Sequence, residues 1–447
     1  MKLNYRRTIL VGLAFLSICV FWQFYDNEIP KILKNTFHLG ETWTGVIMAL
    51  DNVLALFLLP FFGTLSDKTH TGIGKRMPYI LLGTALSVIF LMLLIGVANR
   101  PGRLVLFITI LLCLLVSMGI YRSPAVSLMP DLTPAPLRSK ANAVINLMGT
   151  VGAIYTLIMI KVLLKEPADG SLADYMPLAL SIVVCMVITV CILYLTISEK
   201  KLGQKVREES AAFDAASQKN GTAPAQADAG KEENEAESTE SAPMPAPVKK
   251  SMIFLLLSVF LWFTAYNAVT TAFSRYVEQV WDLHNGAYAD CLMVATIAAV
   301  LSYIPIGQIS SHIGRKKTIL IGVALMSICY LAGSFVPHFS FGINIMFALI
   351  GFGWAAINVN SYPMVVEMSR AGDIGKFTGT YYTFSMAAQV FTPIFSGFLL
   401  EYVSYRTLFP YAFVFSTLAF ITMLMVHHGD SRPVPSKSRL ENFDVDD

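Results

Sequence analysis

The stretch GVIMALDNVLALFLLPFFGTLSDKTHTGIGKRMPYI, residues 45–80, holds the features that decide the fold. Its first part, up to Gly63, is almost wholly apolar and long enough to cross a hydrocarbon core of about 30 Å. A polar and basic segment follows, and a second apolar run begins at Met77. Asp51 lies in the middle of the first run, where a charge is most costly. The stretch predicts a membrane hairpin with an ionisable group inside the membrane.

The whole chain has the composition of a protein that crosses a membrane many times. Of its 447 residues, 55% are hydrophobic and 14% are charged, and the mean hydropathy is +0.59. A soluble chain of this length needs more charged residues to cover its surface. The apolar run after the basic N-terminus lacks a small-residue cleavage site, so we expect a first span there and not a signal peptide. The sequence predicts an all-α membrane protein with about twelve transmembrane helices, at 8–28, 43–62, 78–98, 103–129, 140–164, 176–198, 251–278, 287–309, 317–336, 341–366, 376–400 and 406–427.

A polar segment divides the expected spans into two sets of six. Residues 199–250 are rich in Ala, Glu, Lys, Ser and Pro and hold almost no aromatic side chain. Such a segment cannot bury enough apolar surface to offset the entropy lost on ordering, so we expect a disordered linker. The predicted domains are an N-terminal six-helix bundle at 1–198, the linker at 199–250, a C-terminal six-helix bundle at 251–429 and a tail at 430–447.

The distribution of basic residues predicts the orientation in the membrane. With the N-terminus in the cytoplasm, about 24 Lys and Arg fall on the cytoplasmic side and about 8 on the outer side. Without the long linker, which counts for less, about 16 remain on the cytoplasmic side. We therefore expect a multi-pass protein of the plasma membrane with both termini and the linker in the cytoplasm.

The two halves of the chain repeat a loop motif. GTLSDKTHTGIGKRMPYI begins at Gly63 after the second expected span, and GQISSHIGRKKTIL begins at Gly307 after the eighth. Both read Gly, two residues and Ser, and later Gly with two basic residues before the next apolar run. Internal repeats of several helices are typical of secondary transporters, which hold the substrate between the repeats near the middle of the membrane.

The first of these loops resembles the signature hairpin of the major facilitator superfamily, which reads G-x-L-x-D-[RK]-x-G-[RK]-[RK]. The residues that match in type are Gly63, Leu65, Asp67, Lys68, Gly74, Lys75 and Arg76. Asp67 and Gly74 stand further apart than in the usual motif, and this longer hairpin, followed by MPYI, is similar to the sucrose-transporter-like and glycoside–pentoside–hexuronide cation symporter branch. Arg122 in the fourth span and the Ala141–Ala143 opening of the fifth add to that similarity.

The resemblance covers nearly the whole chain except the linker, and it implies a fold and a way of working. It implies two pseudo-symmetric six-helix bundles that rock about a central cavity, so that access to the cavity alternates between the two sides. It implies that spans one, four, seven and ten line the cavity most closely, with spans two, five, eight and eleven beside them. It also implies a monomer surrounded by membrane lipid.

Asp51 and Arg122 are the candidates for proton coupling. Burial disfavours the ionised carboxylate, and an acid that gains and loses a proton near neutral pH can carry protons across the membrane. The alternative for Asp51 is a polar contact between helices, which is also what we expect of its neighbour Asn52. The guanidinium of Arg122 keeps its charge inside the membrane and needs an acid, carbonyls or water around it. The alternative for Arg122 is a structural ion pair.

Aromatic and amide side chains indicate candidate substrate contacts. FWQFYDNEIP, residues 21–30, combines rings with hydrogen-bonding groups as sugar sites do, although an aromatic belt at a membrane interface has the same composition. Trp354, Asn358 and Tyr362 stand four apart and therefore share a helix face. The alternative for each amide is a packing contact between helices. The candidate substrate residues are Trp22, Gln23, Asp26, Asn146, Tyr266, Asn267, Trp354, Asn358, Tyr362 and Gln389.

Charged residues near the expected cytoplasmic face form a candidate gate. In the superfamily such groups pair between helices and hold the inside-closed state. The second-half hairpin has Ser311 where the acid of the motif would stand. The alternative for the basic residues is that they only keep the loops inside. The candidate gate residues are Gly63, Asp67, Lys75, Arg76, Asp131, Arg138, Arg315, Glu367 and Lys376.

The sequence gives no indication of an enzyme. It holds no catalytic constellation and no Walker phosphate loop, its His and Cys residues lack metal-ligand spacing, and its net charge of +3 suggests no nucleic-acid partner. We expect a secondary active transporter without a cofactor or metal, which imports a sugar or glycoside, of disaccharide size, together with H⁺. The alternatives are a drug-like exporter or organic-anion carrier of the same fold, a sodium-coupled sugar symporter, and a receptor or scaffold that transports nothing.

Overall fold

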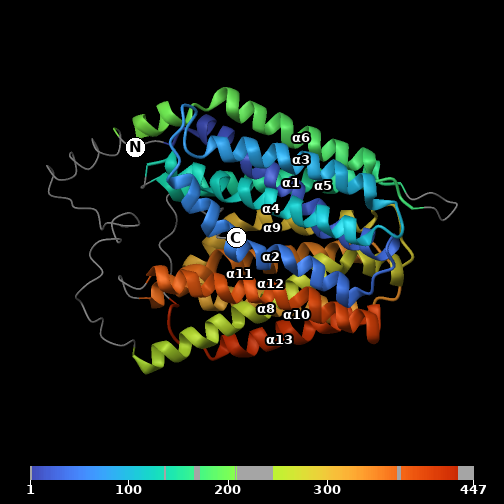
Figure 1. Cartoon of the computed structure of the whole chain (residues 1–447). Helices are drawn as coiled ribbons and strands as arrows, with labels where there is room; N and C mark the ends of the chain where they lie inside the picture. Colours follow the sequence, from blue (N-terminus) through green and yellow to red (C-terminus); the bar gives the residue numbers. More distant parts are fainter. Residues whose placement is uncertain are drawn as a thin grey trace.

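The computed structural model describes residues 3–134, 137–165, 172–206, 208, 245–369 and 374–430. Twelve of the helices in these ranges are long and apolar enough to cross a membrane, which confirms the expected all-α architecture (Figure 1). The helices are α1 (Tyr5–Asn35), α2 (Glu41–Asp67), α3 (Met77–Ala98), α4 (Leu104–Asp131), α5 (Arg138–Leu163), α6 (Met176–Thr196), α8 (Ala246–Val280), α9 (Tyr288–Ile313), α10 (Arg315–Ser334), α11 (Gly342–Met368), α12 (Ile374–Tyr402) and α13 (Leu408–Leu424), with the short 3₁₀ turn η2 (Tyr405–Thr407) before α13.

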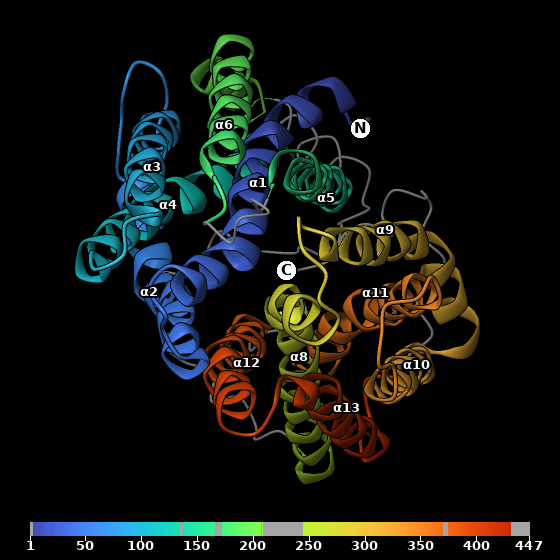
Figure 2. The same ribbon diagram turned by 90° about the vertical axis from the view of Figure 1, so that its right-hand side faces the viewer.

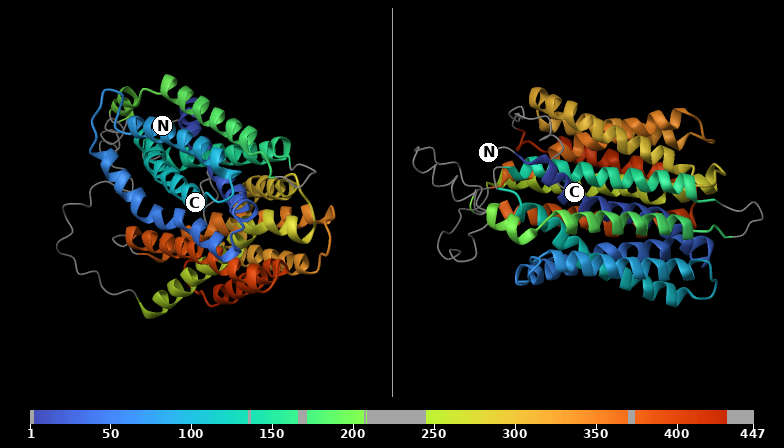
Figure 3. Two further views of the ribbon diagram at one scale, coloured as in Figure 1. Left: turned by 45° about the vertical axis from the view of Figure 1, so that its right-hand side comes forward. Right: turned by 90° about the horizontal axis from the view of Figure 1, so that it is seen from above.

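The helices form two groups of six that lie side by side. Helices α1–α6 make one half and α8–α13 the other, as the end-on view in Figure 2 shows. The two halves share a packing pattern, because α4 packs against α2 and α3 as α11 packs against α9 and α10. The halves meet where α2 lies against α12 and where α5 lies against α9 (Figures 2 and 3). This arrangement agrees with the internal repeat of the sequence.

The loops lie at two opposite ends of the bundle. We call the end that carries the N-terminus and the loop 68–76 the hairpin end, and the end that carries the loop 36–40 the far end. The hairpin end lies on the left in Figure 1.

At the hairpin end of the N-terminal half, Arg76 ties three helices together. It bonds the carboxylate of Asp67 at the end of α2, and its Nε lies 2.8 Å from Oδ2 of Asp131 at the end of α4. Lys75 also pairs with Asp131, at 3.1 Å. The guanidinium of Arg76 is nearly buried and donates to the carbonyl oxygen of Gly63 at 3.2 Å. These contacts fix α2, α3 and α4 relative to one another.

A carboxylate after the last span of this half closes the start of α3. Glu199 accepts hydrogen bonds from the backbone N–H groups of Lys75, Arg76 and Met77, at 2.9 to 3.1 Å. These are the unpaired donors of a helix N-terminus, which favours a negative charge. Gly74 has a φ of +122°, and a Cβ there would lie 2.1 Å from Oε2 of Glu199. A glycine is therefore required both by the backbone and by the carboxylate.

The C-terminal half repeats this device with different residues. Arg315 at the start of α10 pairs with Glu367 at the end of α11, with 2.6 Å between NH1 and Oε2. Asp430, after the last span, accepts from the backbone N–H of Lys316 at 2.8 Å, and Gly314 before it has a φ of +96°. The repeated loop motif of the sequence thus corresponds to a repeated set of contacts. In each half, the third helix is bonded to the fourth helix and to an acid that follows the sixth.

The predicted limits of the linker differ from the structure at both ends. Most of 199–250, and the tail beyond residue 430, lie outside the described residues. Residues 199–206 are helical, and α8 begins at Ala246. The composition of the segment predicted disorder, but it could not reveal that Glu199 binds the N-terminus of α3, some 120 residues earlier in the chain.

We predict that Glu199→Gln lowers the thermal stability of the detergent-solubilised protein. Loss of the anionic helix cap should cost about 1–2 kcal/mol, or roughly 2–6 °C in apparent Tm. The control is Lys200→Gln, which changes an exposed charge beside it without touching α3. Equal melting temperatures for the two variants would show that the Glu199 contact does not stabilise the fold.

Candidate functional site

The membrane helices carry very few charges away from their ends. Apart from charged residues within about two turns of a helix end, the described helices carry Asp26, Asp51 and Arg122. These three residues lie on α1, α2 and α4, which all belong to the N-terminal half. The described helices of the C-terminal half have no charged residue at this depth. Charge inside a membrane is costly and marks functional sites, so the three residues define the candidate site.

Asp51 and Arg122 line one pocket between α1, α2 and α4. Its volume of about 20 Å³ has room for about one water molecule. Arg122 is also 5.5 Å from the centre of the Trp22 ring, within range of a cation–π contact. The sequence predicted that Asp51 and Arg122 belong together, and the structure brings them to the same pocket. The other lining residues are Leu54, Ala55, Leu58, Leu59, Leu115 and Gly119.

Asp51 and Arg122 do not form a direct ion pair. Ser123 donates to the carbonyl oxygen of Leu59 at 2.8 Å, which places Arg122 beside the part of α2 about two turns from Asp51. That offset is about 12 Å along the helix axis at 1.5 Å per residue. In the described part of the chain, no carboxylate lies within 4 Å of the Arg122 guanidinium. The arginine therefore shares a pocket with Asp51 without being neutralised by a direct contact.

The neighbours of Asp51 differ in one respect from the prediction. Asn52 was expected to bond between helices, but it donates to Oδ1 of Asp51 through both its backbone N–H, at 2.6 Å, and its side chain, at 2.8 Å. Adjacent residues of a helix face different directions, so the sequence favoured separate roles for Asp51 and Asn52. The two residues nevertheless bond each other, because the Asp51 side chain folds back onto the neighbouring backbone N–H. Asn52 holds one oxygen of Asp51 in place.

Asp26 completes the charged cluster from α1. It follows Trp22 by one helical turn, and Trp22 lines the pocket of Asp51 and Arg122. Tyr25, next to Asp26, has its hydroxyl 3.5 Å from the carbonyl oxygen of Met48 on α2. The sequence placed Asp26 among the substrate contacts; in the structure it lies nine residues before the far end of α1, while Asp51 lies ten residues after the far-end start of α2.

The candidate substrate residues of the C-terminal half include an aromatic stack. The rings of Tyr266 on α8 and Trp354 on α11 are stacked, with 3.7 Å between centroids and an angle of 2° between planes. The hydroxyl of Tyr362 lies 3.1 Å from the hydroxyl of Thr378 on α12. Asn358 lies between Trp354 and Tyr362 along α11 and is buried. Trp354, Asn358 and Tyr362 follow one another at intervals of one turn, as the spacing predicts.

Two polar groups in these walls lack a hydrogen-bond partner among the described residues. They are the indole N–H of Trp22 and the side-chain nitrogen of Asn267, both buried. Buried donors without partners are rare in folded proteins and suit a water molecule or a bound ligand. The other predicted contacts, Gln23, Asn146 and Gln389, are half-buried on α1, α5 and α12, and Asn146 already has a partner within the protein.

An ion network that sequence reasoning missed joins the halves at the far end. Lys31 of α1 is fully buried and lies 2.7 Å from Oε1 of Glu278 on α8 and 3.4 Å from Oε2 of Glu28. The hydroxyl of Tyr288 on α9 donates to the other oxygen of Glu28. Glu28 is thus a buried partner in this network and does not face outer water.

A second group of charges lies beside the first. Glu41 of α2 accepts from Nε of Arg275 on α8 at 2.8 Å and from the hydroxyl of Tyr405. Lys34 approaches Glu41 at 3.3 Å. Together with Lys31, Glu28 and Glu278 these residues form what we call the far-end network, which has three basic and three acidic side chains and so is neutral as a whole.

Close backbone packing reinforces the far end. A Cβ on Gly45 of α2 would lie 2.0 Å from the carbonyl oxygen of Pro393 on α12, and one on Gly397 would lie 2.4 Å from that of Glu41. Only glycine allows the two helices to approach this closely. The ion pairs at the hairpin end described above join residues of one half, whereas the far-end network joins the two halves. The structure is therefore closed at the far end.

The predicted gate residues pair between helices, but within their own half. This holds for Arg76 with Asp67 and Asp131, and for Arg315 with Glu367. Arg138 donates to the carbonyl oxygen of Thr133 at 3.4 Å. The side chain of Lys376 lies outside the described residues. The other candidates, Gly63 and Lys75, belong to the Arg76 cluster.

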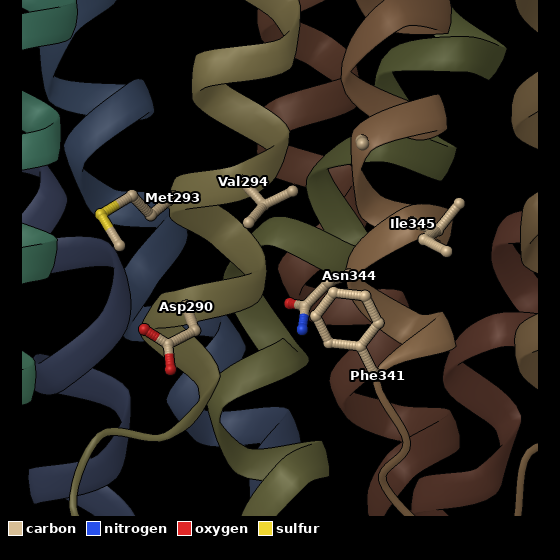
Figure 4. Close-up of a pocket in the computed structure, with 7 residues that line it drawn as sticks. Asp290, Met293, Val294, Phe341, Asn344 and Ile345 are labelled. Carbon is tan, nitrogen blue, oxygen red and sulfur yellow. The ribbon is translucent and has the colours of Figure 1, made fainter.

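A separate groove lies on the outer surface of the C-terminal half. It runs between α9 and α11 near the far end. Figure 4 shows Phe341, just before α11, and Asn344 of α11 near Val294 of α9, with the Asp290 carboxylate turned away from them. Asp290 is already paired with Lys161 of α5 at 2.7 Å. Phe341 is 78% exposed, as expected of a side chain in lipid. The groove is therefore distinct from the pocket of Asp51 and Arg122.

We predict that Lys31→Met opens the far end. The change leaves Glu28 and Glu278 buried without their cation, which should disfavour the closed arrangement by about 3–5 kcal/mol. The distance between spin labels at Lys165→Cys and His284→Cys, in a background without native cysteines, should then show a new and longer population. The control is Asp290→Asn, which breaks the half-exposed pair with Lys161 and should change little. Unchanged distances in Lys31→Met would exclude the network as the closing element.

Comparison with known proteins agrees with this architecture. The Major Facilitator Superfamily model matches residues 11–295 and 255–443. The chain is 20% identical over 325 residues to the isoprimeverose transporter of Lactiplantibacillus pentosus, covering 70% of this chain and 59% of that protein. It is 25% identical over 174 residues to uncharacterised major-facilitator-type transporters of Mycobacterium tuberculosis, covering 37% of this chain and 24% of those proteins. The chain thus aligns with less than two thirds of the length of each of these relatives.

Solved structures share the fold at low sequence identity. The inward-open xylose transporter XylE from E. coli superposes with a TM-score of 0.64 at 13% identity, over 94% of both chains. The nucleoside transporter NupG superposes with a TM-score of 0.63 at 16% identity, over 94% of this chain and 100% of that one. At such identities the likeness concerns the fold alone. The family model, the twelve membrane helices and the paired halves together show that this chain belongs to the major facilitator superfamily.

Proposed function

We propose that the protein is a proton-coupled symporter that imports a sugar or glycoside by alternating access. The hairpin end faces the cytoplasm in this proposal, as the distribution of basic residues predicts, and the protein is a monomer in the plasma membrane. The described conformation is then closed toward the outside by the far-end network.

The observation that carries the proposal is the half-buried carboxylate of Asp51, which shares a pocket with Arg122 inside the membrane. Protonation removes the charge of Asp51 and with it the attraction on Arg122. The guanidinium is then free to bond a substrate hydroxyl. When the proton leaves, the arginine turns back toward the carboxylate, and the substrate loses a partner. Binding of the proton and of the substrate therefore favour each other.

The walls of the site fit a neutral, hydroxyl-rich substrate. The Tyr266–Trp354 stack offers apolar ring surface, and Trp22 and Asn267 offer hydrogen-bond donors that lack partners in the described structure. Apolar ring faces with a few placed polar groups are what small-molecule sites use for binding and specificity. The similarity in sequence to the isoprimeverose transporter supports a sugar as the substrate class.

One observation favours a second candidate, an organic-anion carrier. The guanidinium of Arg122 has no acid within 4 Å among the described residues, and a carboxylate on the substrate would bind it well. A glucuronide and the matching neutral glycoside, offered in competition, distinguish the two. A symporter of neutral sugars prefers the glycoside, because the carboxylates of Asp26 and Asp51 repel the anionic glucuronide.

We predict that Asp51→Asn uncouples transport from the proton gradient. In proteoliposomes with an inward proton gradient, the unmodified protein should accumulate a radiolabelled disaccharide, and a protonophore should abolish the accumulation. Asp51→Asn should exchange the sugar across the membrane without accumulating it, because the amide cannot carry the proton. Asp282→Asn is the control, since the same chemical change there affects a loop side chain that is 94% exposed.

The outcomes of this experiment distinguish the proposed role of Asp51, the substrate class and the coupling ion from their alternatives. Accumulation by Asp51→Asn equal to that of Asp282→Asn contradicts the coupling role of Asp51. If no sugar is moved by the unmodified protein but an organic anion is, the sugar assignment is wrong and the second candidate holds. Accumulation that follows a sodium gradient at constant pH would identify sodium as the coupling ion instead.

A further inference from the structure

A further groove lies on the outer surface of the C-terminal half, at the hairpin end, where α9 meets α10. Its volume of about 550 Å³ is in the range of small-molecule sites. Gly314 alone separates the two helices, which make few contacts with each other, so the groove opens between them. Figure 2 shows α10 at the outside of its half, away from α1–α6, and the groove therefore faces lipid. We call it the corner groove, and its lining residues are His312, Ile313, Lys317, Leu320 and Ile321.

Each wall of the corner groove is an apolar stripe that ends in a nitrogen-bearing side chain. On α10, Ile321 and Ile328 follow Lys317 by about one and three helical turns, and Ile328 is 65% exposed. On α9, Leu301 precedes His312 by about three turns and is 70% exposed. Residues at these intervals share a helix face. Both helices thus present apolar side chains to the membrane interior and a polar head at the hairpin end.

Lys317 is the last of three consecutive basic residues, and its charge is the one left for a ligand. Arg315 pairs with Glu367, and Nζ of Lys316 donates to a backbone carbonyl oxygen of α13 at 3.0 Å. Asp430 is taken up by the backbone N–H of Lys316. Within the described ranges, Lys317 has no carboxylate within 4 Å and no hydrogen-bond partner. Since no lining residue is an acid, the corner groove is positively charged.

The groove between α9 and α11 near the far end has the opposite character. It also opens to lipid and has a volume of about 410 Å³, but its charged lining residue is the acid Asp290. The nearby base Lys161 is already paired with that acid. Two lipid-facing grooves of one half therefore differ in charge, and an anionic headgroup can distinguish them.

We propose that the corner groove binds one anionic phospholipid. Its phosphate lies against Lys317 and His312, and its acyl chains lie along the apolar stripes of α9 and α10. Basic pockets between membrane helices attract the headgroups of anionic lipids in this way. A free phosphate would leave the apolar walls unused, so the shape of the groove favours a lipid. The site does not depend on which substrate the protein moves.

The test compares lipid contact at the two grooves. Bimane is attached at Ile321→Cys in the corner groove, or at Val294→Cys in the groove between α9 and α11, in a background without native cysteines. Nanodiscs of phosphatidylcholine carry a minor fraction of brominated phosphatidylglycerol or of brominated phosphatidylcholine, whose bromine quenches bimane on contact. The glycerol lipid should bind beside Ile321→Cys about fivefold better than the choline lipid, the factor expected of one lysine near an anionic headgroup. The two lipids should quench Val294→Cys equally.

Substitution of Lys317 assigns the preference to the groove. Added to Ile321→Cys, Lys317→Gln should remove most of the preference for phosphatidylglycerol, and Lys317→Glu should turn it into a preference for phosphatidylcholine. The control is Lys249→Gln, which removes an exposed charge from the first turns of α8 at the same end and should leave the preference unchanged. Equal melting temperatures in phosphatidylcholine show that the variants are folded alike.

Several outcomes would overturn the proposal. They are equal quenching of Ile321→Cys by the two lipids, the same preference at Val294→Cys, and a preference that survives Lys317→Gln. Excess inorganic phosphate, at matched ionic strength, should not relieve the quenching, and relief would show a site for free phosphate instead of a lipid. If neither lipid quenches Ile321→Cys and native mass spectrometry shows a dimer, a second copy of the chain covers the groove and the lipid assignment is wrong.

Discussion

The low polarity of the membrane is the constraint on which the rest of the structure depends. A charge that cannot reach water has to be neutralised by a partner or by a proton. The charged residues of the described helices meet this demand in three ways. Those at the hairpin end pair within one half, those at the far end pair across the halves, and Asp51 and Arg122 at the centre share a pocket without a direct ion pair. Each arrangement has a different mechanical consequence.

Pairing within a half makes that half rigid. Arg76 and Glu199 bind α2, α3 and α4 into one block. In the other half, Arg315 joins α10 to α11 through Glu367, and Asp430 binds the start of α10. Pairing across the halves, as Lys31 does with Glu278, holds one relative position of two such blocks. Rigid blocks joined by contacts that can break are what a rocking motion requires.

The sequence predicted what depends on local pattern. The membrane spans follow from apolar length, the repeat from two loops, and the shared face of Trp354, Asn358 and Tyr362 from the helical period. The far-end network was missed because Lys31 and Glu278 are far apart in the chain and lie at or beyond the limits of their apolar runs. The helices continue past those runs, since charges that find partners there need not reach water. Residue types alone do not reveal such pairs before the fold is known.

The two walls of the central site differ in a way that bears on coupling. The N-terminal wall carries all the charge of the site, and the C-terminal wall is aromatic and neutral in the described helices. A proton that binds Asp26 or Asp51 therefore changes the electrostatics of one half alone and has no charged group to act on in the other. Closure of the halves has to sense the proton through something that contacts both walls. In the proposed symport, a substrate held between Arg122 and the Tyr266–Trp354 stack would meet that condition, so that the loaded site would close as a unit and the half-loaded site would not.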